Sequence, residues 1–305
     1  MSYLRSKKLY RADNDGTFWP GLIEIPEKIK SDKIDSTQKI TKKKLFSDPR
    51  IFTGISLLLF VTLFFTSKTS AFILLILIAF IATKEWFDLF DYGIILPYPL
   101  LLYAALAPVL ITFYYGFENF YVPFFIFPLG FIIYTGTFVS YGIYDKFGSS
   151  FLFLIWFGTG LASIGYLLST FGNWFTFFSL ISISLSDVAA YEYGKRYGKK
   201  KLAINISPNK TIEGFVMGLI VGVISMSIVL FVFFNIKFSV ILLVSVFFII
   251  FATLGDLFES KIKRSLDVKD SSHFLPGHGG VLDRIDSQLL SFPVLVLFLQ
   301  FLDLI

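Results

Sequence analysis

Residues 238–256 read FSVILLVSVFFIIFATLGD, and they contain no charged side chain before Asp256, the last residue of the run. A helix needs roughly 20 apolar residues to cross a bilayer. The stretch therefore predicts a membrane-spanning helix with Gly255 and Asp256 at its C-terminal end.

Similar apolar segments recur along most of the chain. Of its 305 residues, 55% are hydrophobic and 19% are aromatic, a composition typical of a protein whose main solvent is lipid. We expect an all-α fold, a polytopic transmembrane helix bundle of about nine spans, within a range of about eight to ten. The second segment reaches spanning length only if its helix continues through Lys84, Glu85 and Trp86. The nine segments begin near Ile51, Ser70, Ile94, Phe120, Phe151, Trp174, Phe215, Phe238 and Leu289.

The distribution of basic residues predicts the orientation, because Lys and Arg accumulate in short cytoplasmic loops. With nine spans and a cytoplasmic N-terminus, the sixth and eighth loops lie inside, and these are the two basic loops. We expect an integral, multi-pass protein of the cell or inner membrane with its active site on the cytoplasmic face. The basic residues of these loops are Lys195, Arg196, Lys199, Lys200, Lys201 and Lys210, then Lys261, Lys263, Arg264, Lys269 and Arg284.

The chain divides into two regions by composition. Residues 1–49 are polar, lack the apolar core of a signal peptide, and are expected to form a flexible cytosolic N-terminal arm. Residues 50–305 form the transmembrane domain, and its active-site loops are expected at 186–214 and 255–287.

Several chemistries are excluded by what the sequence lacks. There is no cysteine, so disulfides, thiolate zinc sites and cysteine nucleophiles are absent. The two histidines, His273 and His278, flank a Pro-Gly turn and are read as hydrogen-bonding residues. The sequence has none of the glycine-rich signatures of soluble nucleotide-binding enzymes and no serine-hydrolase elbow. We expect no nucleic-acid partner.

The run that follows Gly255 combines acids, bases and a hydroxyl at helical spacing. If the helix continues, Asp256, Glu259, Ser260 and Lys263 share one face. Such a stripe offers both metal ligands and phosphate donors. The alternative is that the acids only pair with neighbouring arginines.

The end of the same loop carries a glycine-rich turn and a second pair of acids. Gly279 and Gly280 follow His278 and let a backbone approach a ligand closely. Asp283 and Asp286 are three residues apart, so on a helix they project together. Clustered acids at a membrane boundary repel each other unless a cation lies among them, and Mg²⁺ suits one or two carboxylates combined with substrate phosphates.

The sixth loop repeats this theme. Asp187 lies in an otherwise apolar segment, where an acid is a functional candidate, although a helix cap or a hydrogen bond within the bundle would also account for it. Residues 207–214, SPNKTIEG, resemble a helix start in which Ser207 caps and Pro208 takes the first position. Lys210 and the free N–H groups there could hold an anion, and an ordinary cap is the alternative.

These motifs together resemble the phosphatidate cytidylyltransferase (CDP-diglyceride synthase) family. The family signature is a Ser, a Lys-Arg pair, a Lys-Asp pair, a His-Gly-Gly and an Asp-Arg-x-Asp at fixed spacing. This chain carries these as Ser260, Lys263-Arg264, Lys269-Asp270, His278-Gly279-Gly280 and Asp283-Arg284-Ile285-Asp286.

The resemblance implies that CTP and phosphatidate react in the presence of Mg²⁺ to give CDP-diacylglycerol and pyrophosphate, and that the protein forms a homodimer in the lipid bilayer. The expected catalytic residues are Asp256, Asp283, Asp286, Lys263, Arg264, Lys269 and Asp270. Substrate and phosphate binding is expected from Ser207, Lys210, Thr211, Glu213, Asp187, His278, Gly279, Gly280 and Arg284. The expected metal ligands are Asp256, Asp283 and Asp286.

Other functions remain open on the residues alone. A related membrane enzyme acting on another lipid phosphate, or a polyprenol or phytol kinase, would use the same type of site. A transporter would also have many spans, but it would give no reason for a dense Lys, Asp and Gly loop at one membrane face.

Overall fold

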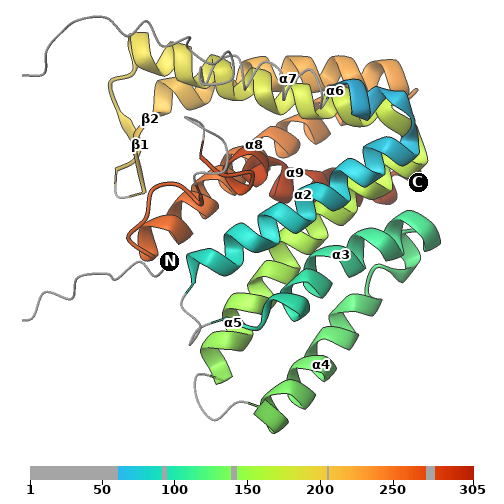
Figure 1. The fold of residues 1–305 in the computed structure, drawn as a ribbon. Helices are drawn as coiled ribbons and strands as arrows, with labels where there is room; N and C mark the ends of the chain where they lie inside the picture. Colours follow the sequence, from blue (N-terminus) through green and yellow to red (C-terminus); the bar gives the residue numbers. More distant parts are fainter. Residues whose placement is uncertain (1–60, 91–94, 139–142, 205, 273–278) are drawn as a thin grey trace, which may run out of the picture. The chain divides into compact units, whose positions relative to one another are not determined.

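A computed structural model describes residues 61–90, 95–138, 143–204, 206–272 and 279–305. These residues are almost entirely helical, with one two-stranded hairpin (Figure 1). After a helical stretch at 61–66, the elements are α2 (Lys68–Leu89), α3 (Tyr98–Tyr115), the 3₁₀ turn η2 (Phe117–Asn119), α4 (Val122–Phe138), α5 (Ile143–Phe153), the π-helical turn η3 (Leu154–Gly158), α6 (Thr159–Tyr197), β1 (Lys201–Ala203), β2 (Ser207–Thr211), α7 (Ile212–Phe233), α8 (Phe238–Ser265) and α9 (Leu282–Phe301).

The helices have the lengths that a membrane requires. Within the described ranges, five are long and apolar enough to cross a bilayer, and α4 is a shorter apolar helix. The expected all-α, membrane-embedded bundle is confirmed. The N-terminal arm at 1–49 lies outside the described residues, and the cytoplasmic N-terminus stays a prediction. The five are Lys68–Leu89, Tyr98–Tyr115, Ile143–Tyr197, Ile212–Phe233 and Phe238–Ser265, where Ile143–Tyr197 takes α5, η3 and α6 together as one helix.

Helix α2 continues through the charged pair that the sequence left uncertain. Ser67 and Ser70 form a capping box at its start, and the helix runs past Lys84 and Glu85 to Leu89. Both Glu85 and Trp86 are buried, so this end of α2 is covered by other elements.

A break at Gly172 separates two of the predicted spans. Gly172 has φ 80° and ψ −171° inside the otherwise helical α6, a conformation that glycine adopts without a steric penalty. The sequence placed the start of a new span near Trp174. The break lies at that boundary. The two apolar segments on either side of it therefore belong to one helix, α6, that is interrupted only at Gly172.

Close packing of α7 on α6 positions Asp187. Gly214, Gly218 and Gly222 are spaced four apart on α7, the spacing that lets membrane helices approach closely. A Cβ on Gly218 would lie 2.8 Å from the Ser186 carbonyl oxygen, and the Ser186 hydroxyl donates to the Gly218 carbonyl at 2.9 Å. The residue next to Asp187 is therefore fixed against α7.

The expected helix start at Ser207 is wrong. Residues Ser207–Thr211 form β2, which pairs antiparallel with β1, and α7 begins only at Ile212. Thr211 is the actual cap, and its hydroxyl accepts the Gly214 N–H at 3.2 Å. Pro208 fits because a two-stranded hairpin consists of edge strands, where a missing N–H is tolerated.

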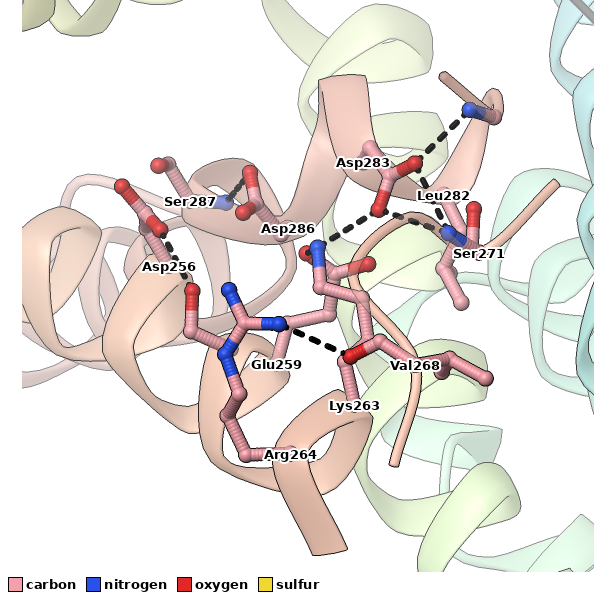
Figure 2. A network of polar contacts seen from close by, with 12 residues as sticks. Asp256, Glu259, Lys263, Arg264, Val268, Ser271, Leu282, Asp283, Asp286 and Ser287 are labelled. Carbon is pink, nitrogen blue, oxygen red and sulfur yellow. Dashed lines mark hydrogen bonds and ion pairs between the residues drawn. The ribbon is translucent and has the colours of Figure 1, made fainter. Parts of the chain in front are cut away.

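Helices α8 and α9 cross at a glycine. A Cβ on Gly255 would lie 2.6 Å from the Asp286 carbonyl oxygen and 3.2 Å from the Ser287 Cα. This crossing brings Asp256, the next residue on α8, near Asp286 on α9 (Figure 2).

We predict that Gly218→Ala destabilises the protein, whereas Gly130→Ala does not. The new methyl at 218 would press on backbone and on Ala190, while a Cβ at Gly130 meets nothing within 4 Å. Overpacking of this kind costs about 1–3 kcal/mol. Thermal unfolding in detergent, followed by size-exclusion fluorescence, measures the difference. Equal midpoints for the two variants would contradict the close α6–α7 contact.

Candidate active site

A cavity of about 930 Å³ lies where the ends of α6, α7, α8 and α9 meet the hairpin. Residues from both predicted active-site loops line it. The two loops, far apart in sequence, therefore share one cavity. Its charged lining residues are Asp187, Lys195, Lys201, Lys210, Asp256, Lys263, Asp283, Arg284 and Asp286.

Asp256 links the two loops. Its carboxylate accepts a hydrogen bond from the Ser260 hydroxyl at 3.3 Å, one turn along α8. It also forms an ion pair with the ammonium of Lys210, which comes from β2. The polar face expected on α8 is therefore present. Its cationic partner, Lys210, comes from the other active-site loop.

Lys263 lies between two carboxylates on the next turn of α8 (Figure 2). Its Nζ is 2.9 Å from Glu259 Oε2 and 2.6 Å from Asp283 Oδ1. The exposed fractions of the three side chains are 11% for Lys263, 1% for Glu259 and 10% for Asp283. Because water reaches these charges poorly, each depends on the others for compensation.

Asp283 is held by donors on several sides. Besides Lys263, it accepts the Ser271 N–H at 3.0 Å and the Gly280 N–H at 2.7 Å (Figure 2). Burial raises the pKa of the Asp283 carboxyl, but the hydrogen bonds from Lys263, Gly280 and Ser271 outweigh it and hold the pKa below its usual range. Asp283 therefore acts as an ionised anchor between α8, α9 and the loop.

The remaining acids of the site lie close to one another. Asp256 is close enough to Asp187 and to Asp286 for their charges to repel. Asp286 is buried, accepts the Ser287 N–H at 2.7 Å, and lies against the carboxyl of Glu259. Glu259 Oε1 is buried and meets no donor in the described part of the chain. These acids therefore repel one another, although the cavity wall is lined by as many lysines as aspartates.

This wall fits a divalent cation only in part. No group of three acidic or histidine side chains converges on one point within the described ranges, so Asp256, Asp283 and Asp286 are not brought together as one ligand set. The oxygens of Asp283 already accept three N–H donors. Asp256 and Asp286 both line the cavity, and two carboxylates that repel each other suit a cation that takes its other ligands from substrate phosphate and water.

Other predicted residues lie away from the cavity wall. Arg264 donates from Nη1 to the Val268 carbonyl at 2.9 Å and from Nε to the Ile206 carbonyl at 3.4 Å. Glu213 accepts the backbone N–H of Lys199 at 3.0 Å, which closes the turn between α6 and β1. Among the described residues, Ser207, Glu213, Arg264, Lys269, Asp270, Gly279 and Gly280 do not line the cavity, and His278 is outside the described residues.

Sequence reasoning assigned no role to Glu85, the buried acid of α2. Its carboxylate accepts four hydrogen bonds from residues 271–282, next to the site. An acid inside an apolar segment is the signal that could have marked it.

Fold and site together define a membrane-embedded helical protein with a polar cavity of mixed charge at one end of its helices. The chain belongs to the Cytidylyltransferase family, because the sequence profile of that family matches residues 49–302.

Curated relatives carry a more specific name. The chain is 40% identical to a phosphatidate cytidylyltransferase of Staphylococcus saprophyticus over 168 residues, which cover 53% of this chain and 65% of the relative. It is 44% identical to the Bacillus subtilis enzyme of the same name over 133 residues, covering 43% of this chain and 49% of the relative. The aligned parts therefore span about half to two thirds of these relatives.

We predict that Lys263→Met destabilises the protein strongly. The substitution leaves Glu259 and Asp283 buried without their shared cation, and breaking a buried pair in this way typically costs about 3–5 kcal/mol. Lys261→Met is the matched control, because Lys261 is exposed on the same helix. Thermal midpoints in detergent measure both variants, and a midpoint for Lys263→Met equal to that of the control would show that the pair contributes nothing.

Proposed function

We propose that this protein transfers the cytidylyl group of CTP to phosphatidate, giving CDP-diacylglycerol and pyrophosphate. The observation that supports this most is the shared cavity, where Lys210 from one loop meets Asp256 from the other in a membrane protein of the cytidylyltransferase family. A cavity at the helix ends would let soluble CTP meet a lipid headgroup without either substrate crossing the bilayer.

The reaction needs little proton chemistry. A phosphomonoester has a second pKa of about 6, so the phosphatidate phosphate is already an anionic nucleophile at neutral pH. Its oxygen forms a new bond to the α-phosphorus of CTP, and the bond from that phosphorus to pyrophosphate breaks. Catalysis then depends on positioning and on neutralising the phosphate charges.

Cations of the cavity wall supply that neutralisation. In our proposal Lys210, Lys263 and Arg284, which line the cavity, hold the phosphates of the two substrates. Arg264, in the last turn of α8, and Lys269, on the loop that follows, are exposed outside the cavity and would attract CTP from solvent. Asp187 and Thr211 line the cavity, and we propose that Asp187 orients Lys210 or a bound cation.

We propose Mg²⁺ as the cation, held by Asp256 and Asp286, with Asp187 beside Asp256. The anchored Asp283 is left as a support for the wall rather than a ligand. Bound Mg²⁺ would neutralise phosphate charge and bring the two anionic substrates together.

Location and assembly complete the proposal. Both loops that line the cavity are basic, and such loops are usually cytoplasmic, so we place the active site on the cytoplasmic face. We also propose a homodimer, which rests on the family resemblance alone and which mass measurement in detergent can test.

The assay is purified protein in detergent with CTP, phosphatidate and Mg²⁺, monitoring both pyrophosphate and the CDP-lipid. We predict product with wild type, and a loss of kcat of at least about 100-fold for Asp256→Asn. Asp267→Asn is the control, because Asp267 is exposed just after α8 with φ 56°, where asparagine is well tolerated.

Three results would contradict this assignment. Product only with another lipid phosphate would change the substrate, and transfer of the γ-phosphate to a lipid alcohol would indicate a kinase. Absence of any product with every combination of lipid and nucleoside triphosphate would exclude an enzyme.

Metal removal tests the cation separately. We predict that EDTA abolishes product formation and that Mg²⁺ restores it, with Asp286→Asn requiring roughly 10-fold more Mg²⁺ because one ligand is lost. An unchanged Mg²⁺ requirement in that variant would remove Asp286 from the metal site.

A further inference from the structure

The buried carboxylate of Glu85 connects α2 to the start of α9. Its Oε1 accepts the Val281 N–H at 2.9 Å and the Ser272 hydroxyl at 2.6 Å, and its Oε2 accepts the Leu282 N–H at 2.8 Å. The Ser271 hydroxyl lies 3.5 Å from Oε2. Glu85 is only 4% exposed.

These bonds replace a cap that α9 lacks. The first N–H groups of a helix have no partner within the helix, and they are usually capped by a nearby side chain. Val281, the N-cap residue of α9, makes no such bond, so Glu85 supplies the acceptor from another helix. A negative charge at this end of a helix is also favoured by the helix dipole.

Ser271 and Gly280 make the arrangement compact. The Ser271 N–H donates to Asp283, while its hydroxyl is directed to Glu85. A Cβ on Gly280 would lie 2.0 Å from the Ser271 hydroxyl oxygen and 2.7 Å from Glu85 Oε2. Ser271 is therefore bound both by Glu85 of α2 and by Asp283 of α9.

We propose that Glu85 is a positioning residue, which fixes the first turn of α9 and thereby sets where Asp286 and Arg284 stand in the cavity. It acts through α9 and does not itself line the cavity among the described residues. Its effect on turnover rests on the proposed cytidylyl transfer, whereas its effect on α9 does not.

Glu85→Gln is the direct test, because it keeps the shape but places an amide NH₂ against N–H and O–H donors. The control is Asp88→Asn, an acid-to-amide change on the same helix at a side chain that is 54% exposed. Hydrogen exchange followed by mass spectrometry reports on the amides of Val281 and Leu282, and steady-state kinetics per folded molecule report on turnover.

We expect hydrogen exchange at residues 281–282 to become roughly 10-fold faster in Glu85→Gln. We expect kcat to fall roughly 10- to 100-fold, the loss typical of residues that orient metal ligands without binding the metal. The KM for CTP should rise as well, because a displaced Arg284 would hold the substrate phosphates less tightly. The control should match wild type in all three measurements.

Two results would overturn the proposal. One is unchanged exchange at 281–282. The other is a lowered thermal midpoint with wild-type kcat per folded molecule, which would give Glu85 a purely structural role.

If Glu85→Gln does not fold, Ser272→Ala removes a single donor and decides the question. We expect roughly two- to fivefold effects on exchange and kcat, the size of one hydrogen bond, and wild-type values would contradict us. A wild-type protein without transferase activity would reject the proposed function, while the exchange measurement would still test the contact of Glu85 with α9.

Discussion

The site depends on one requirement, that charges buried at the end of an apolar bundle be compensated by one another. Lys263 meets it by binding Glu259 on its own helix and Asp283 on α9, so the polar wall and the α8–α9 contact form together. The crossing at Gly255 allows this, since any side chain there would press on the backbone of Asp286. Packing and electrostatics are thus satisfied at the same place.

Local spacing predicted much of this arrangement from the sequence. The apolar lengths predicted the helical bundle, and the boundary near Trp174 coincides with the break at Gly172. The three- and four-residue intervals after Gly255 predicted one polar face, which is seen in the contact between Ser260 and Asp256. These features depend only on the periodicity of a helix and the thickness of a membrane.

What the sequence did not predict depends on contacts between distant segments. The hairpin at Ser207 is the local exception, because its partner strand β1 lies only a few residues upstream and pairs with the backbone that the expected helix start would have used. Lys210 meets Asp256 across 46 residues, and Glu85 meets Leu282 across 197. Asp283 and Asp286 were treated as equivalent because of their spacing, yet the donors around Asp283 distinguish them.

Ser271 has a consequence for how such proteins diverge. Its N–H is bound by a carboxylate of α9 and its hydroxyl faces a carboxylate of α2, so one small residue is constrained by two helices that are remote in the chain. Substitutions at these three places are coupled, and a change in one is tolerated only when the others accommodate it. Exchanging the first helices between two relatives would then separate residues that diverged together, and a chimera would inherit mismatched partners.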